Sequence, residues 1–418
     1  MKKAAIFFYL LVLISSYSLS QKDDSHFSIK AESGYIEVDG GKLFYEIAGE
    51  GEYIVLLHDG ILHHEIWDAQ FPVLAENYRV VRYDRRGYGK SFSPQAPFSH
   101  VDDLSQLFIQ LKIDKAILFG MSAGGGIVID FALQYPEKVN GLVLVGAVVS
   151  GYGFSAHFFT RGGHINSLLE YLEPQKFIKY FGWEDPYEVY PENIKAKEKF
   201  LRLLEANPLN VTGALGYFVK PLERAAVKSL HEIKVPVLVL VGEYDIPDVH
   251  AHSGVIEAGI PNAKREIIFK AGHLIPLEQP EAFNASVLIF LRSLEFFNIL
   301  NSQGVVSSVQ YFHKKREAEP GIILFEEREM NLLGYRYLQN GKNKDAIELF
   351  KLNTIAFPDS WNAYDSLGES YLLDGQKDLA IKNYEKSLEL NPQNTNAQEK
   401  LRSIKKLIVS VTAYAAQS

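Results

Sequence analysis

Short continuous apolar runs that alternate with helical patterns are the feature that most constrains the fold of this chain. The runs occupy residues 53–57, 80–83, 116–119, 141–145, 237–241 and 264–269. Unbroken runs of this length are typical of strands buried on both faces of a parallel sheet. Helical patterns lie at residues 66–75, 101–111, 124–134 and 280–294. Because strands and helices alternate, the sequence predicts an α/β fold with a mostly parallel sheet covered on both faces.

Residues 150–231 interrupt this alternation. The segment is mostly helical in pattern, rich in Phe and Tyr, and lies between two of the predicted core strands. An insertion at that point projects over the carboxyl edge of the sheet, where the loops that follow parallel strands gather. We therefore expect a helical cap over residues 150–231, inserted into a core made of residues 21–149 and 232–297.

Beyond residue 297 the sequence repeats itself with an offset of 34 residues. The offset superposes Leu333 on Leu367, Gly334 on Gly368, Tyr337 on Tyr371, Gly341 on Gly375, Ala346 on Ala380, Phe350 on Tyr384 and Pro358 on Pro392. This pattern resembles the tetratricopeptide repeat, a pair of antiparallel helices that small residues allow to pack closely. Met330 and Asn353 depart from it, at positions where the repeat usually has Trp and Ala. We expect an all-α tail over residues 298–418, closed by a third helix at residues 394–407.

The composition excludes several classes of function. The chain of 418 residues has a formal net charge of -8 and no cysteine. A nucleic acid must be met by a basic groove, and none is visible in this sequence. Without cysteine there are no disulfides, thiolate zinc sites or cysteine nucleophiles. The chemistry must therefore use oxygen and imidazole groups, and we predict no cofactor.

Residues 1–20 have the pattern of an export signal. Lys2 and Lys3 precede an apolar run over residues 4–14, and small residues follow before a cut ahead of Gln21. The run is shorter than the roughly 18 to 20 residues of a spanning helix. We expect cleavage of the signal, no membrane-spanning segment in the mature chain, and a periplasmic or extracellular location. An exported enzyme cannot rely on cytosolic cofactors, which favours hydrolysis.

The segment Gly120-Met121-Ser122-Ala123-Gly124 joins a predicted strand to a predicted helix. A serine hydroxyl that attacks a substrate projects from a tight strand-to-helix turn, which needs neighbours without bulk. The two glycines meet this steric condition. The same turn directs the Ala123 amide, at a helix N-terminus, toward a developing oxyanion. We predict that Ser122 is a nucleophile and that the Ala123 amide forms part of an oxyanion hole.

A proton acceptor and a carboxylate follow two later strands. His273 lies on a glycine-containing loop after the run at residues 264–269, where it can reach the serine as a general base. The imidazole in turn needs a buried carboxylate that fixes its tautomer. We choose Asp245, just after the preceding apolar run, with Asp248 as the main competitor and Glu243 expected to face solvent.

The chain order Ser122, Asp245, His273, with each residue just after a strand, resembles the α/β-hydrolase superfamily over residues 34–296. The resemblance implies a nucleophile on strand five, an acid after strand seven and a histidine after strand eight. A segment that includes Arg86 looks like the family's turn after strand four. We expect Arg86 to tie loops together by hydrogen bonds rather than to anchor a substrate.

The segment Leu57-His58-Asp59-Gly60-Ile61 ends the third strand, where relatives usually have His-Gly and a following residue whose amide completes the oxyanion hole. Asp59 stands at the usual Gly position. This departure leaves Gly60 and Ile61 as candidates for the second amide. We favour Gly60, because its position matches the residue after His-Gly.

Four side chains are candidates for substrate contact. His63 and His64 follow the oxyanion segment, while Phe154 and Phe158 lie in the predicted cap. We predict no metal at the histidines, because their spacing does not fit a helical HExxH motif. The aromatic residues could line an apolar pocket, although we expect most cap aromatics to form a small core of the cap itself.

With serine as nucleophile, the resemblance implies acyl transfer through an acyl-enzyme. The run from His58 to Arg86 is similar to the esterase and enol-lactonase branch, so we predict hydrolysis of an ester or lactone of a small apolar acid. An iminopeptidase-like or aminopeptidase-like amide hydrolase stays open. Such an enzyme needs acidic cap residues to bind a free amine, and the cap offers Glu170, Glu173, Glu184 and Glu188.

A noncatalytic protein that binds a partner through the repeat tail is the alternative from another class. Two repeats and a capping helix form only a short groove, so we interpret the tail mainly as a packing or self-association unit. A triad in the family's order also disfavours an inactive core.

Overall fold

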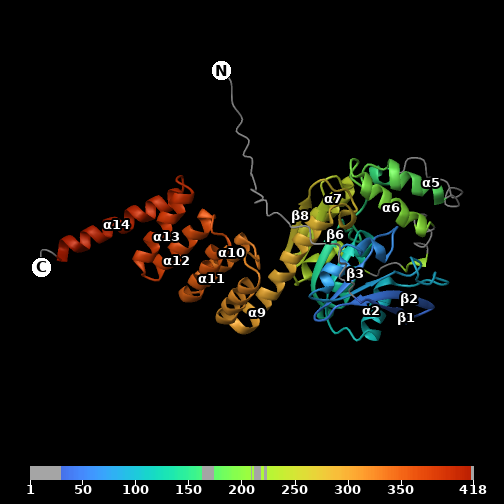
Figure 1. The fold of residues 1–418 in the computed structure, drawn as a ribbon, viewed down its shortest axis with the longest axis horizontal. Helices are drawn as coiled ribbons and strands as arrows, with labels where there is room; N and C mark the ends of the chain where they lie inside the picture. The colour runs from blue at the N-terminus through green and yellow to red at the C-terminus, as the bar shows by residue number, and fades with distance from the viewer. Residues whose placement is uncertain (1–29, 162–173, 209, 211–217, 221–223, 416–418) are drawn as a thin grey trace, which may run out of the picture.

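The computed structural model describes residues 30–161, 174–208, 210, 218–220 and 224–415. The predicted export signal at residues 1–20 lies outside this part of the chain. At one end of the molecule a sheet is packed between helices, and at the other a row of helices extends away from it (Figure 1). Helix α9, Pro280–Ala318, joins the two parts (Figure 1).

The sheet contains eight strands in the order β1-β2-β4-β3-β5-β6-β7-β8. The strands are β1 Glu32–Val38, β2 Gly41–Ala48, β3 Tyr53–Leu57, β4 Arg79–Tyr83, β5 Ala116–Met121, β6 Val139–Val145, β7 Val237–Gly242 and β8 Ala263–Ile268. The β1–β2 and β2–β4 pairs are antiparallel, and the remaining pairs are parallel. The predicted mostly parallel α/β sheet is confirmed.

Alternate residues of the buried strands supply two hydrophobic clusters, one on each face of the sheet. Ile54 and Leu56 of β3 belong to the cluster that includes α9, whereas Val55 and Leu57 belong to the other. Side chains alternate between faces along a strand, so a strand buried on both sides must be apolar throughout. The covering helices are α1 Phe71–Ala75, α2 His100–Gln110, α3 Ala123–Gln134, α7 Pro247–Gly259, α8 Ile275–Glu278 and the first part of α9.

Two predicted helices differ from the structure at their ends. The helix expected at residues 66–75 is broken into a 3-10 turn η1, His64–Trp67, and α1, which begins next to Pro72. Proline has no amide hydrogen to continue a helical ladder, which explains the break. The helix expected at residues 280–294 continues to Ala318. The helix expected at residues 101–111 is α2, and Ser99 caps it, because its hydroxyl accepts from the Asp102 amide at 3.2 Å.

The inserted segment is helical in the part that the structure describes. Its elements are α4 Ala156–Thr160, α5 Pro174–Lys179, the π-helix η4 Tyr180–Glu184, α6 Ile194–Ala206, and the 3-10 turns η7 Ala226–Lys228 and η8 Leu230–Glu232. Phe177 of α5 and Phe200 of α6 are buried in the same cluster as Trp67 and Phe283. These aromatics therefore pack with the core rather than in a separate core of the cap.

Helix α9 contributes to two hydrophobic clusters in succession. Its first part packs against one face of the sheet. The part that contains Phe296 and Phe312 belongs to a cluster of the tail. Position 298, where we expected the tail to begin, lies inside this helix. Gly304 has φ 83°, a left-handed conformation that favours glycine, and kinks the helix. By length and composition α9 could cross a membrane, yet its apolar side chains fill these two clusters.

The tail continues as antiparallel helices in the predicted 34-residue pattern. They are α10 Glu327–Gln339, α11 Asn343–Ala356, α12 Trp361–Leu373, α13 Lys377–Leu390 and α14 Thr395–Ala415. A Cβ on Gly334 would lie 2.5 Å from the Phe350 ring, and one on Gly368 would lie 3.1 Å from the Tyr384 ring. The repeat thus preserves the same close glycine–aromatic contact in each helix pair.

Both departures from the repeat pattern are accommodated inside the tail. Met330 is fully buried in the cluster that contains Phe296. Asn353 is also fully buried, and its side-chain amide donates to the Glu327 carbonyl at 3.1 Å. The hydrogen bond offsets only part of the cost of burying an amide where the repeat usually has an alanine, because Asn353 Oδ1 is buried without a partner among the described residues.

Candidate active site

Ser122 stands on a sharp turn between β5 and α3. Its φ of 52° and ψ of -115° are rare for a residue with a side chain, and its amide donates to the Val145 carbonyl at 2.8 Å. A Cβ on Gly120 would lie 2.5 Å from the Gly124 carbonyl oxygen, and a Cβ on Gly124 would lie 2.4 Å from the His58 carbonyl oxygen. Both glycines are therefore required sterically. Ser122 remains partly exposed, so a substrate can reach it.

The structure brings His273 and Asp245 together. The His273 Nδ1 and Asp245 Oδ1 atoms are 2.8 Å apart, and both side chains are buried. The same carboxylate oxygen accepts from the Ile246 amide at 2.7 Å. Because the carboxylate can only accept, Nδ1 carries the proton and Nε2 is left as the basic nitrogen.

The His273 ring also lies beside the turn that holds Ser122. A Cβ on Gly146 would lie 2.9 Å from the His273 ring and 3.1 Å from Asp245 Oδ2. Gly146 directly follows Val145, whose carbonyl holds the Ser122 amide at 2.8 Å. The side chains predicted from separate strands therefore gather at one edge of the sheet.

The competitor Asp248 has a different position. Its carboxylate accepts from the backbone amide and the hydroxyl of Ser155, at the start of α4. His157 Nδ1 lies 3.9 Å from it. Asp248 therefore fastens the inserted segment to α7, and Asp245 alone of the two is bonded to His273.

Negative charges surround His273 and alter its basicity. Burial lowers the pKa of His273, but the charge and hydrogen bond of Asp245 outweigh burial, and Glu188 and Asp59 add to this effect. The result is a pKa of about 9. An imidazole with this pKa is mostly protonated at neutral pH, and its neutral form, the one that accepts a proton, increases toward alkaline pH.

The loop that carries His273 is held by residues that the sequence analysis did not identify. Glu278, the last residue of the short helix α8 that follows His273, accepts from the Gly272 amide at 2.9 Å and from the Tyr190 amide at 2.6 Å. The His273 amide itself donates to the Tyr187 carbonyl at 2.8 Å. Burial raises the pKa of Glu278 to about 8, although these amide bonds oppose the rise. The inserted segment therefore fixes the histidine loop directly.

Asp59 braces the loop that follows β3. Its Oδ1 accepts from the amides of Ile61 at 2.6 Å and Leu62 at 2.9 Å. Ile61 is thereby excluded as a free oxyanion donor. The Gly60 carbonyl accepts from the Tyr88 hydroxyl at 2.9 Å, and a Cβ on Gly60 would lie 3.7 Å from the Ala123 Cβ. Within the described residues the Gly60 amide has no hydrogen-bond acceptor, so it is available beside Ala123.

His58 holds the same loop through hydrogen bonds of its ring. Its Nε2 accepts from the Arg85 amide at 2.9 Å, so the proton resides on Nδ1, which donates to the Asp59 carbonyl at 2.9 Å. Burial and the nearby Arg85 charge hold the pKa of His58 well below its ordinary value. His58 is therefore neutral and acts as a brace. Arg86 is a brace as well, since its guanidinium donates to both carboxylate oxygens of Asp103.

His63, His64 and Asp84 form a buried group whose candidate ligand atoms all lie within 4.8 Å of one another. The spacing of the histidines does not reveal this grouping, because His63 and His64 follow β3 whereas Asp84 follows β4. Asp84 Oδ1 accepts from the amide and Nδ1 of His64 at 2.8 and 2.7 Å, and its Oδ2 accepts from the Lys90 amide at 2.8 Å. Protein donors already occupy both carboxylate oxygens. Among the three residues, His63 Nε2 alone is buried without a partner in the described part of the chain.

These contacts distinguish the two histidines that we predicted to touch a substrate. His64 directs Nδ1 to Asp84, and its Nε2 lies 3.8 Å from Glu46. A substrate would have to compete with a carboxylate for either nitrogen. His63 is buried with a free Nε2, so the prediction of a substrate contact now depends on His63.

Comparison with known proteins agrees with this geometry. A family model described as alpha/beta hydrolase fold matches residues 53–280, and a tetratricopeptide repeat model matches residues 361–394. The chain belongs to the alpha/beta hydrolase fold family. Both predicted resemblances, to this family and to the tetratricopeptide repeat, are confirmed.

Relatives of this alpha/beta hydrolase differ in the substrates that their names give. Carboxylesterase YbfK of Bacillus subtilis is 24% identical, over 66% of this chain and 93% of the relative. A 2-hydroxy-6-oxononadienedioate/2-hydroxy-6-oxononatrienedioate hydrolase of Burkholderia vietnamiensis is 32% identical, over 63% of this chain and 96% of the relative. A solved structure of an N-acyl homoserine lactone degrading enzyme has a TM-score of 0.51 and 26% identity, over 61% of this chain and 98% of that one. The chain is thus an alpha/beta hydrolase related to esterases and lactonases.

The aromatic candidates of this hydrolase lie above the carboxyl ends of β6 and β7. Phe154 stacks on Phe158 with ring centroids 4.1 Å apart, and on its other side it lies 4.8 Å from the His252 ring. Phe158 packs against a small cluster that contains Val241 and Ile246. Phe154 also lines a pocket that includes Ala123, whereas Phe158 is not among the residues that line it.

The acidic cap residues do not form a free anionic pocket in the described part of the chain. Glu184 pairs with Lys179 at 3.0 Å, and Glu188 Oε1 pairs with Arg161 Nη2 at 2.8 Å. Arg161 Nε also lies 3.2 Å from Asp185. Glu170 and Glu173 lie outside the described residues.

Proposed function

We propose that this chain is an exported serine hydrolase that cleaves a carboxylic ester or lactone of a small apolar acid through an acyl-enzyme on Ser122. The observation that carries the proposal is the 2.8 Å bond from His273 Nδ1 to Asp245, beside the strained turn of Ser122. This bond leaves the basic Nε2 of His273 for the serine proton.

The reaction has two steps. Ser122 Oγ attacks the carbonyl carbon and His273 Nε2 takes its proton, while the amides of Gly60 and Ala123 stabilise the oxyanion. The tetrahedral intermediate collapses, the carbon–oxygen bond to the alcohol breaks, and His273 gives its proton to the leaving oxygen. Water then attacks the acyl-enzyme as His273 takes a proton from it, and the acid leaves as Ser122 recovers its proton.

Relatives support the ester and lactone class. Among them are a carboxylesterase and an enzyme that degrades N-acyl homoserine lactones. A carbon–carbon bond hydrolase is a second candidate, favoured by the 32% identity to the hydrolase of Burkholderia vietnamiensis. Glu188 Oε1 is neutralised by Arg161, which weakens the amide-hydrolase alternative, although Glu188 Oε2 has no partner among the described residues and so keeps that alternative in the panel below.

A substrate panel tests this assignment. Purified protein is given p-nitrophenyl esters, lactones, aminoacyl amides and 2-hydroxy-6-oxo-6-phenylhexa-2,4-dienoate, and kcat/KM is measured for each. We expect the highest values for esters or lactones, and their loss in Ser122→Ala. A preference for aminoacyl amides or for the dienoate would contradict the ester and lactone class while leaving the triad intact.

Export and the role of the tail belong to the same proposal. N-terminal sequencing of the secreted protein is expected to begin at Gln21, and a chain that retains residues 1–20 would contradict signal cleavage. The tail, which matches the tetratricopeptide repeat at residues 361–394, is proposed to support self-association or a protein contact.

A further inference from the structure

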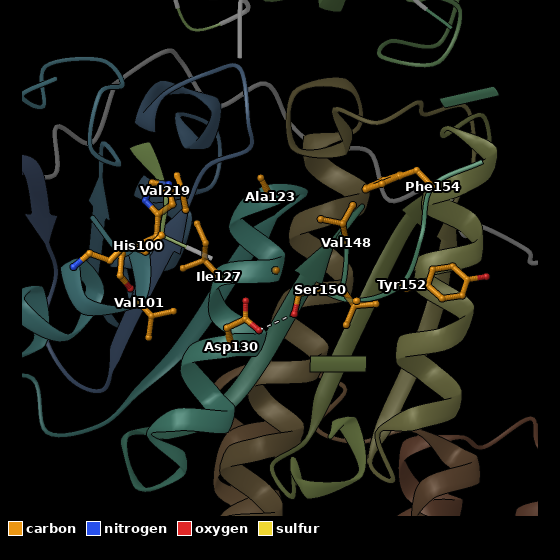
Figure 2. A pocket seen from close by; sticks show the side chains of 15 residues that line it. His100, Val101, Ala123, Ile127, Asp130, Val148, Ser150, Tyr152, Phe154 and Val219 are labelled. Atoms are coloured by element: carbon orange, nitrogen blue, oxygen red, sulfur yellow. Dashed lines mark hydrogen bonds between the residues drawn. The ribbon is translucent and has the colours of Figure 1, made fainter. Parts of the chain in front are cut away.

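A pocket of about 310 Å³ lies along one face of α3, the helix that Ser122 opens. Ala123, Gly126, Ile127 and Asp130 line it from this helix. Their spacing of three, four and seven residues places them on the same helical face. In Figure 2, Ala123, Ile127 and Asp130 descend along α3, with His100, Val101 and Val219 on one side and Val148 and Ser150 on the other.

The walls of the pocket are fixed by backbone hydrogen bonds. The Ser150 hydroxyl accepts from the Ala226 amide at 2.9 Å, and the Val149 amide donates to His252 at 3.1 Å. On the opposite wall, Val219 forms a bridge with Phe98. The pocket is therefore preformed rather than a gap between mobile loops.

Most of the lining is apolar, and a carboxylate lies at its far end from Ser122. The Ser150 hydroxyl donates to Asp130 Oδ1 at 3.1 Å, as drawn in Figure 2. Asp130 is half-buried, and Ser150 bonds to its Oδ1 atom alone, which leaves Oδ2 without a hydrogen-bond partner among the described residues. Burial raises the pKa of Asp130 to about 6, so the group is mostly ionised at neutral pH.

Asp130 is the acidic residue among those that line the pocket, and the two basic candidates, His100 and Lys220, do not neutralise it inside the pocket. Burial and the charges of Arg85 and Arg86 hold the pKa of His100 well below its ordinary value, so the imidazole is neutral. Lys220 also lines the pocket but is exposed at its edge. An ionised carboxylate with a free oxygen selects a hydrogen-bond donor.

We infer that this pocket is an acyl-chain subsite that takes a medium-length chain ending in a hydroxyl or ammonium group bound by Asp130. The inference rests on the proposed function and names its substrate class. Of the residues assigned to the reaction, Ala123 lines the pocket, whereas Ser122, Gly60 and His273 do not. We therefore place the acyl chain past Ala123 along α3, and the leaving group on the side of His273, which must protonate it.

The length of the chain follows from helix geometry. Ala123 and Asp130 are seven residues apart, which is roughly 10 Å at 1.5 Å per residue. An extended chain advances by roughly 1.25 Å per carbon–carbon bond, so this distance corresponds to a chain of roughly eight bonds.

The test compares p-nitrophenyl octanoate with its ω-hydroxy and ω-amino analogues. Wild type is expected to favour both analogues by roughly tenfold or more in kcat/KM, the effect of one hydrogen bond to a charged group. Asp130→Asn keeps the shape and the Ser150 contact but removes the charge, so the preference for the ω-amino chain should disappear. Asp114→Asn, at an exposed carboxylate before β5, is the matched control and should keep the preference.

A second variant tests the location of the chain independently of the charge. Ile127→Phe narrows the pocket and is expected to lower the ratio of octanoate to acetate hydrolysis at least tenfold. If wild type cleaves esters without preferring the analogues, or if neither ratio changes in the variants, the subsite is wrong and the proposed function stands. If no ester or lactone is cleaved, both the subsite and the proposed function are wrong.

Discussion

Asp59 departs from the family pattern, and its side chain holds the loop that follows β3. Glycine is usual at this position, yet the carboxylate returns to the chain and accepts from the amides of Ile61 and Leu62. The brace leaves the Gly60 amide free beside Ala123. We therefore assign Asp59 a positioning role for the proposed oxyanion hole.

Asp59→Ala is expected to lower kcat roughly 100-fold with little change in KM, because the loop loses the acceptor that fixes the Gly60 amide. Asp59→Asn is the matched control, since its side-chain oxygen can accept from the same amides, and it should retain most of the turnover. Steady-state kinetics on p-nitrophenyl acetate distinguish the two. Equal losses in both variants would show that the charge, rather than the brace, is what matters.

The negative charges around His273 predict that the rate of hydrolysis increases toward alkaline pH. With a pKa of about 9, His273 is protonated below that pH, so kcat/KM should rise with pH and level off above it. Glu188 raises this pKa, and Glu188→Gln removes its charge while the positive Arg161 remains nearby. The rising limb should therefore move to lower pH, by on the order of one unit. A limb that stays in place would contradict the electrostatic role of Glu188.

At the scale of single elements, the turn from β5 to α3 depends on close backbone contact. A Cβ on Gly124 would lie 2.4 Å from the His58 carbonyl oxygen, so Gly124→Ala should destabilise the fold by roughly 2 kcal/mol or more. Gly254→Ala in α7 is the control, because the nearest atom to its Cβ would be the Arg265 side chain at 3.5 Å. That change should be neutral or stabilise by up to about 1 kcal/mol. Urea unfolding measures both, and a neutral Gly124→Ala would contradict the steric argument.

The sequence predicts these elements well where one local rule decides. The apolar run at residues 53–57 is typical of a strand buried on both faces, and the glycines around Ser122 indicate the turn. The helical pattern at residues 66–75 predicts one helix, but Pro72 breaks it, so the apolar pattern alone is not sufficient there.

Contacts between distant segments could not be predicted in the same way. The Tyr190 amide donates to Glu278 across 88 residues. His64 meets Asp84 only because β3 and β4 are neighbours in the sheet. No periodicity or motif marks such pairs, since they depend on how the loops converge after the sheet has formed.

For the whole molecule, α9 is the connection between hydrolase core and repeat tail. Phe296 of α9 lies 5.0 Å from Phe325, which in turn stacks at 5.6 Å on Phe312. The two parts are therefore joined through α9, which is kinked at Gly304, and the tail cluster contains none of the site residues.

Phe325→Ala should remove about 3 to 5 kcal/mol from the stability of the tail, because the side chain is fully buried. Ester hydrolysis should keep its kcat and KM at temperatures where the tail cluster is disrupted. Calorimetry measures the stability of the tail, and activity assays on the same variant measure kcat and KM. A parallel loss of activity would show that the tail supports the active site through α9.

Labelling with a serine-directed fluorophosphonate, followed by peptide mass spectrometry, tests the central claim most directly. The account predicts one adduct on Ser122 in the wild-type chain, none in Ser122→Ala, and much slower labelling in His273→Ala. A wild-type chain that takes up no probe, or a Ser122→Ala chain that still hydrolyses p-nitrophenyl acetate, would contradict it.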